Sequence, residues 1–258
     1  MSIEVLISTI NSNPKSLIKK MNLQTDAIII CQNNKFGYEE VNYKTKTIKI
    51  YYFNEKGVAI SRDAALQRST KDIILFADDD EEFIDGYEQI IKNEFAKNLN
   101  IDMFFFNLYK DTKPVFNNKE KRIHKFNCLK YGTVSIAAKR KKIVANNIHF
   151  CQLFGPGSIY GSGEDSIFIY DSLNKGLKLK SSEKCIATLL TSDSTWFDGY
   201  NEKYYFDKGA LFRKLHGKNS SLFNLLYVLR HKKQGETLSL RQKLHIMETG
   251  KKEYSELM

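Results

Sequence analysis

The chain has 258 residues, a formal net charge of +10, and 42% hydrophobic and 12% aromatic residues, so it can build a packed core and is not disordered throughout. No apolar run approaches the ~20 residues that a bilayer span needs. The first residues carry only a short apolar run without a basic region, so we expect no signal peptide and a cytoplasmic protein.

Apolar, β-branched runs alternate with segments of helical spacing from the start of the chain to residue 109. Strands are predicted at 3–9, 26–34, 46–53, 71–80 and 101–109, and helices at 14–23, 61–70 and 83–98. This alternation is typical of an α/β protein with a mostly parallel sheet and helices on its faces. Uninterrupted apolar runs such as 27–30 and 73–76 fit strands that are buried on both faces.

The regular alternation of strand and helix patterns changes after residue 110. A polar loop or hairpin at 115–126 is followed by a strand with a basic stretch, then by a glycine-rich loop that enters a helix at 154–179. Another strand begins at Cys185, and basic helices are predicted from residue 203. We therefore predict one domain over residues 1–213 and a C-terminal helical extension over residues 214–258.

Five carboxylates follow the four largely apolar residues 74–77, and the first three are Asp78, Asp79 and Asp80. Adjacent carboxylates repel one another unless a cation or hydrogen-bond donors offset their charge. Mn²⁺ or Mg²⁺ suits this role, since such ions take one or two protein carboxylates together with substrate phosphates. Pleating directs Asp78 and Asp80 one way and Asp79 the other, so one aspartate can hold the metal while another meets a ribose hydroxyl. The alternative is a solvated acidic turn that caps the next helix.

A second acidic pair, Glu164 and Asp165, stands where the glycine-rich segment GSGEDSIF enters a helix. Ligands bind at the carboxyl ends of strands in open sheets of this class. A carboxylate on a loop at that rim can act as a general base beside a metal-bound substrate. The alternative is structural: Ser162 caps the helix, and Asp165 is its capping-box partner.

Four segments, taken in order, resemble the family-two glycosyltransferases, which have the GT-A fold. They are ISTIN (7–11), GVAISRDAAL (57–66), FADDD (76–80) and GSGEDSIF (161–168). The segment 194–212 is also similar to one in the bacterial polysaccharide-synthesis branch, and the resemblance as a whole covers residues 3 to 213. It implies a Rossmann-like nucleotide-binding sheet with a DXD motif.

The resemblance implies an inverting transfer of a sugar from a metal-bound nucleoside diphosphate sugar, with UDP expected, to a hydroxyl of a glycan or lipid-linked glycan. It points to the synthesis of bacterial capsule, exopolysaccharide or lipopolysaccharide. Asp165 is then the catalytic base, Asp80 binds Mn²⁺ or Mg²⁺, and Glu164 and Trp196 lie toward the acceptor. The residues implied at the nucleotide sugar are Ser8, Ile10, Gln32, Arg62, Asp78 and Asp79.

Three positions depart from the family's pattern. Gln32 stands where an acid usually reads the base, and Asp63 replaces a common asparagine. No histidine occurs in TSDSTW (191–196), where relatives supply a further metal ligand, so either Asp193 substitutes for it or the metal is held more weakly.

Two basic segments have alternative interpretations. We expect KRKK (139–142) to be a solvated face, because no aromatic residues interleave with it as a nucleic-acid platform requires. The segment 222–233 is either a helix packed on the core or a helix that contacts an anionic membrane surface, which would place the protein at the inner face of the cell membrane.

The rival functions are a sugar nucleotidyltransferase and a nucleic-acid-binding module. The first should open with a glycine-rich loop, which ISTINSNPK lacks, and the second is suggested only by charge. We expect no nucleic-acid partner.

Overall fold

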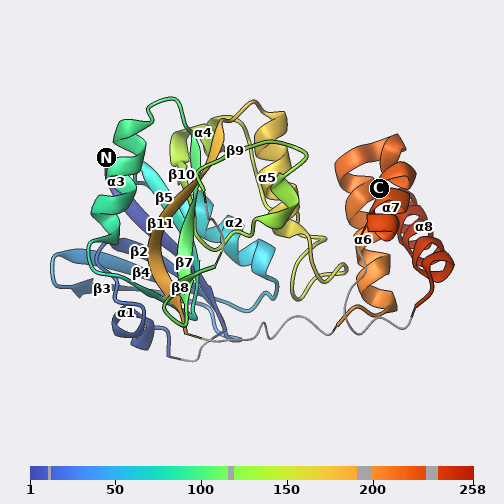
Figure 1. Ribbon diagram of the computed structural model, residues 1–258. Helices are drawn as coiled ribbons and strands as arrows, with labels where there is room; N and C mark the ends of the chain where they lie inside the picture. The colour runs from blue at the N-terminus through green and yellow to red at the C-terminus, as the bar shows by residue number, and fades with distance from the viewer. Residues whose placement is uncertain (11–12, 116–118, 191–198, 231–237) are drawn as a thin grey trace.

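The computed structural model describes residues 1–10, 13–115, 119–190, 199–230 and 238–258 (Figure 1). The strands are β1 (Ile3–Thr9), β2 (Asp26–Gln32), β3 (Gly37–Tyr43), β4 (Lys46–Phe53), β5 (Ile73–Asp78), β6 (Glu81–Phe83), β7 (Met103–Lys110), β8 (Lys113–Pro114), β9 (Arg122–Ile123), β10 (Ile136–Lys139) and β11 (Leu179–Leu189). The helices are α1 (Ser16–Lys20), α2 (Val58–Arg68), α3 (Tyr87–Lys97), α4 (Arg140–Ala145), α5 (Glu164–Asn174), α6 (Glu202–His216), α7 (Ser220–Arg230) and α8 (Leu240–Leu257). Short 3₁₀ turns lie at Cys128–Lys130 and Gly217–Asn219.

The strands form one mixed sheet in the order β3-β4-β2-β1-β5-β10-β7-β11-β6, with β8 and β9 added beside β7 and β11. β4, β2, β1 and β5 are parallel neighbours, and β7 is parallel to β11. β10 runs antiparallel to both β5 and β7. The α/β prediction of a mostly parallel sheet flanked by helices is therefore confirmed.

The central strands are buried on both faces. In β1, Val5 packs into the core beneath α1 and α3, whereas Leu6 packs into the core beneath α2, α4 and α5. Successive strand residues point to opposite faces, so a doubly covered strand must be apolar at nearly every position. Each fully buried aliphatic side chain contributes about 1.5–3 kcal/mol relative to its exposed state.

Most predicted elements match, and the differences have local causes. The strands at 3–9 and 46–53 have the predicted limits. The polar strand β3 was not predicted, because it is an edge strand that pairs only with β4 and leaves much of its length exposed. The helix predicted at 83–98 begins only at Tyr87, because Glu81–Phe83 pairs with β11 and Gly86 has a φ of +76°.

Helices α6, α7 and α8 pack together beside α5, as Figure 1 shows. A Cβ at Gly209 would lie 1.9 Å from the Met247 carbonyl oxygen, and one at Gly250 would lie 2.1 Å from that of Phe206, so the backbones of α6 and α8 touch. The predicted domain boundary after residue 213 falls inside α6. No helix of the described residues is both long and apolar enough to cross a membrane.

Of the predicted segment 222–233, α7 contains the part up to Arg230, and the remainder lies outside the described residues. One side of α7 packs through Val228, which is buried. The other side leaves Leu222, Leu225 and Leu229 exposed. The helix therefore packs on its neighbours and also presents an apolar stripe.

Candidate active site

The carboxyl ends of β2, β1 and β5 bring the first predicted site residues to one rim. Ser8 is in register with Asp78 across β1 and β5, and Gln32 ends the neighbouring β2. Ile10 follows β1 directly and is 67% exposed. Trp196 and Asp193, predicted for the acceptor and the metal, lie outside the described residues. The parallel topology thus places the predicted nucleotide side at one edge of the sheet.

The acidic triplet forms the end of β5 and the turn into β6. The Asp79 carboxylate accepts a hydrogen bond from the Thr9 hydroxyl, and the Asp79 carbonyl accepts one from the Lys20 ammonium at 2.9 Å. The Asp80 carbonyl accepts the Leu190 N–H at 2.8 Å, which fixes the turn against the end of β11. The next helix is preceded by Gly86 and has no side-chain cap, so the triplet does not serve as a helix cap.

The centre of the site is the Arg62 cluster, which consists of Arg62, Asp78, Thr133, Glu164 and Asp165. The Arg62 side chain is only 5% exposed. Its Nη2 donates to Asp78 Oδ1 at 2.9 Å, while its Nη1 donates to Asp165 Oδ1 at 2.8 Å and to Glu164 Oε1 at 3.1 Å. Nη1 also lies 3.2 Å from Thr133 Oγ1. One guanidinium therefore joins both acidic motifs, which are far apart in the sequence.

Asp165 is held by several hydrogen bonds and is partly exposed. Its Oδ2 accepts the Thr133 N–H at 3.0 Å, and its Oδ1 accepts from the Thr133 hydroxyl and from Arg62. The Asp165 and Glu164 side chains also share a hydrogen bond. The Asp165 side chain is 28% exposed, so a substrate hydroxyl can reach it.

Glu164 lies behind Asp165 and is buried. Its Oε2 accepts the Gly163 N–H at 3.1 Å, and Gly163, with a φ of +121°, is the N-cap of α5 without a side-chain cap. The predicted cap by Ser162 is therefore absent. A Cβ at Gly155 would lie 2.9 Å from the Glu164 carboxyl carbon, so the glycine-rich loop packs directly on this acid. The acceptor role of Glu164 stays a prediction.

Burial and neighbouring charges shift the proton affinities in the cluster. Burial, with the Asp165 charge, raises the pKa of Glu164 to about 8 although Arg62 opposes the shift. Burial likewise raises the pKa of Asp78 against the effect of Arg62. The buried Glu81 accepts the Asp78 N–H at 2.9 Å through Oε1, and its pKa is raised well above the usual range because it is desolvated beside Asp78. Burial alone would lower the pKa of Arg62, but the three carboxylates raise it, so Arg62 stays charged.

Other predicted residues hold α2 against the sheet through hydrogen bonds. Gln32 Nε2 donates to the Gly57 carbonyl at 3.2 Å, just before α2 begins. Ser61 Oγ donates to Ser8 Oγ at 2.8 Å. Asp63, which is buried, accepts the Phe150 N–H at 2.9 Å and lies 3.2 Å from His149 Nδ1. The aspartate that departs from the family pattern therefore ties α2 to the chain before the glycine-rich loop.

Among the described residues, no group of three or more His, Cys, Asp or Glu side chains is arranged to hold a metal ion. Arg62 holds Asp78, and Thr9 holds Asp79. The role of Asp80 as the metal ligand stays a prediction.

Sequence reasoning did not assign roles to three residues of this site. Thr9 lies within the segment ISTIN and Glu81 directly follows FADDD, so their position beside a strand end was the available signal. Thr133 lies in no motif and comes to the site only through the chain path before β10. No sequence signal would have identified it.

Comparisons with known proteins agree with this geometry. The model of the family described as glycosyl transferase family 2 matches residues 8–156. The structure of Staphylococcus aureus TarS 1–349 with UDP-GlcNAc is similar with a TM-score of 0.62 and 12% identity, over 99% of this chain and 73% of that one. The structure of the same protein with UDP has a TM-score of 0.59 and 13% identity, and the match covers 99% of this chain and 72% of that one. Another TarS structure has a TM-score of 0.57 and 11% identity, and the match covers 99% of this chain and 44% of that one. These likenesses show a shared GT-A-like fold. No curated protein sequence matches the chain.

Proposed function

The chain belongs to glycosyltransferase family 2 and is a glycosyltransferase, and from that premise we propose that it moves a sugar from a UDP-sugar to a glycan hydroxyl with inversion. One observation carries the proposal. Arg62 bonds at once to Asp78, at the strand end where the nucleotide is expected, and to Glu164 and Asp165, where the acceptor is expected. The two halves of a transfer site thus share one buried cation.

The donor is proposed to be a UDP-sugar bound with Mn²⁺ or Mg²⁺. The TarS structures that share this fold contain UDP or UDP-GlcNAc, which supports uridine as the base. Asp80 would hold the ion, because it is the last aspartate of FADDD, the segment that resembles the metal-binding motif of the family. One carboxylate with diphosphate oxygens and water is a ligand set that Mg²⁺ accepts. Such an ion, when bound, offsets charge on the departing diphosphate.

Asp165 is proposed as the general base. Its carboxylate accepts the proton of the acceptor hydroxyl while that oxygen forms a bond to the anomeric carbon and the bond to UDP breaks. The Thr133 N–H and hydroxyl and the Arg62 guanidinium keep the carboxylate in one orientation. A positioned base of this kind contributes typically 10²–10⁴-fold to a rate.

The acceptor is proposed to be a growing bacterial surface glycan that is carried on a lipid. The sequence resemblance of segment 194–212 motivates this choice, and the exposed stripe of Leu222, Leu225 and Leu229 beside Arg230 supports contact with an anionic membrane surface. An apolar helix face with adjacent basic charge is typical of such contact.

Thermal unfolding with UDP tests the donor proposal. UDP should raise the Tm of the parent clearly more with Mn²⁺ than with EDTA, and Asp80→Asn should remove most of that difference. Glu82→Gln is the matched control, because Glu82 is an exposed acid of the same segment that pairs with Thr188 on β11. Equal stabilisation by UDP in EDTA and in Mn²⁺ would contradict a metal-bridged diphosphate.

A further inference from the structure

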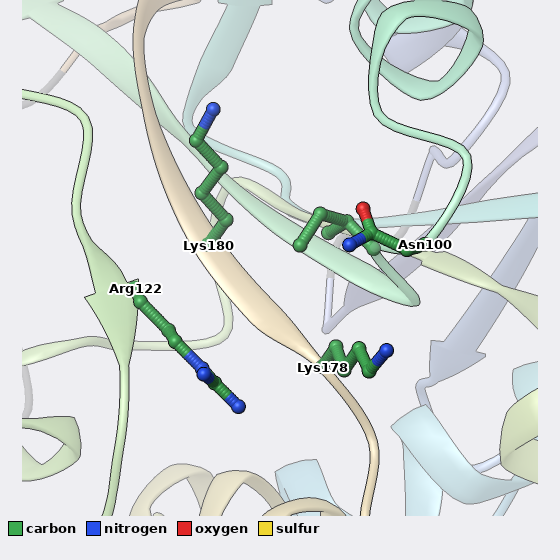
Figure 2. A pocket seen from close by; sticks show the side chains of 5 residues that line it. Asn100, Arg122, Lys178 and Lys180 are labelled. Atoms are coloured by element: carbon green, nitrogen blue, oxygen red, sulfur yellow. The ribbon is translucent and has the colours of Figure 1, made fainter.

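Two open cavities of about 300 and 400 Å³ adjoin each other at the amino end of β11. Figure 2 shows the first, with Lys180 projecting from β11, Lys178 from the residue just before it, Arg122 from the neighbouring β9, and Asn100 from the chain after α3. The second shares Arg122 and Lys178 and adds Lys125. Among the described residues that line the two cavities, four are Arg or Lys and none is acidic.

The cavities lie away from the Arg62 cluster. Leu179 is in register with Met103, Met103 with Ala138, and Ala138 with Ile74, which lies four residues before Asp78. At ~3.3 Å for each residue and ~4.8 Å for each strand crossed, Leu179 and Asp78 are roughly 20 Å apart. A ligand in the cavities is therefore separate from a nucleotide at the acidic triplet.

The protein balances only part of the positive charge around the cavities. Arg122 and Lys180 face each other in register across β9 and β11, an arrangement of like charges that is unfavourable in itself. Lys180 has a partner, since its ammonium lies 2.6 Å from Glu120 Oε2. The guanidinium of Arg122 and the ammonium of Lys178 have no hydrogen-bond or ion-pair partner within the described parts of the chain.

The basic stretch 139–142 adds to the same corner. Asp102 Oδ2 accepts the Lys178 N–H at 3.0 Å, and its Oδ1 lies 4.0 Å from the Lys142 ammonium. The Lys139 ammonium donates to the Leu99 carbonyl at 2.7 Å, next to Asn100. Clustered positive charge beside a concave surface raises the local concentration of anions.

We propose that Arg122 and Lys178 bind the phosphate group of a ligand at the amino end of β11, in a second site apart from the transfer site. The guanidinium fork matches two phosphate oxygens, and the ammonium supplies a compact second charge. The Asn100 amide, which lines the same cavity, offers a further N–H donor. The phosphate belongs either to a soluble phosphorylated molecule or to a lipid headgroup.

Calorimetric titration of the full chain with inorganic pyrophosphate tests the soluble source. EDTA is present, so that no metal bridges the probe to Asp80. Arg122→Gln with Lys178→Gln should weaken binding about tenfold or more, the usual effect of losing a charge-assisted contact. The control variant, Lys44→Gln with Lys252→Gln, removes the same charge from exposed sites in the turn between β3 and β4 and on α8. It should change the affinity less than about twofold.

Sedimentation with phosphatidylglycerol–phosphatidylcholine vesicles tests the headgroup. If the Arg122/Lys178 pair changes vesicle binding and pyrophosphate does not bind, the headgroup is the ligand. If the parent binds neither probe, or if the control pair weakens binding as much as the test pair, the proposal is wrong. The Tm shift with UDP and Mn²⁺ should survive in both double variants, so its loss would concern the transfer site and not this one.

Discussion

Replacement of Arg62 by methionine should destabilise the fold in a pH-dependent way. Methionine fills similar space but leaves Asp78, Glu164 and Asp165 without their shared cation. Removing one partner of a buried ion pair costs about 3–5 kcal/mol. The side chains of Asp78 and Asp165 are 38% and 28% exposed, so water replaces part of the lost interaction. We therefore expect a loss of about 3 kcal/mol at pH 8.

The pH dependence follows from the direction of the pKa shifts. Arg62 lowers the pKa of Asp78 and of Glu164, so both should rise further in Arg62→Met. A carboxyl whose folded-state pKa is raised stabilises the fold at low pH, and that contribution is lost as the pH rises through the folded-state pKa. The loss of unfolding free energy should therefore be smaller at pH 5 than at pH 8.

Urea denaturation followed by circular dichroism at the two pH values measures this difference. Arg68→Met is the matched control, because Arg68 lies on the same helix, donates to the Ala64 carbonyl and stacks over Tyr51 and Phe53. It should show no comparable pH dependence. If Arg62→Met is as stable as the parent at pH 8, or equally destabilised at both pH values, the cluster does not depend on this cation.

Two further predictions concern Glu164 and α7. The pKa of Glu164 is about 8 in the fold against 4.5 in a free side chain, so its contribution to the stability of the parent should fall by an amount on the order of a few kcal/mol between pH 5 and pH 8. Glu164→Gln should remove that part of the pH dependence of the unfolding free energy. If urea unfolding gives the same pH dependence for the two proteins, Glu164 is ionised in the fold. Leu225→Ser with Leu229→Ser should reduce salt-sensitive sedimentation with anionic vesicles, whereas Leu240→Ser, an exposed leucine of α8, should not; a parent that stays in the supernatant at low salt would exclude α7 as a membrane contact.

Periodicity predicted the sheet because its central strands are continuous apolar runs covered on both faces. β1 and β4 were predicted to the residue. β3 and β6 were missed for different reasons: β3 is polar and pairs on one side only, and β6 has three residues whose pairing with β11 is a long-range contact. Contacts of that kind leave no local pattern in the sequence.

The sequence predicted most residues of the candidate site but not the contacts that join them. Ordered motifs pointed to the strand-end aspartates and to the acids before α5. The sequence did not indicate that Arg62 would be buried between them, because its partners are 16, 102 and 103 residues away. Thr133 was missed because a lone threonine before a strand has no distinguishing neighbours. Its backbone and side chain act together only in the fold.

The most direct test of the proposed mechanism is a comparison of Asp165→Asn with the parent for sugar transfer and for UDP binding in Mn²⁺. Asparagine keeps the shape of the side chain but cannot take a proton. The transfer rate should fall by about 10² or more, while UDP binding stays close to that of the parent. Asp171→Asn, on the same helix, controls for the change of charge. Transfer at the parental rate, or loss of UDP binding, would contradict the assignment of Asp165 as the base.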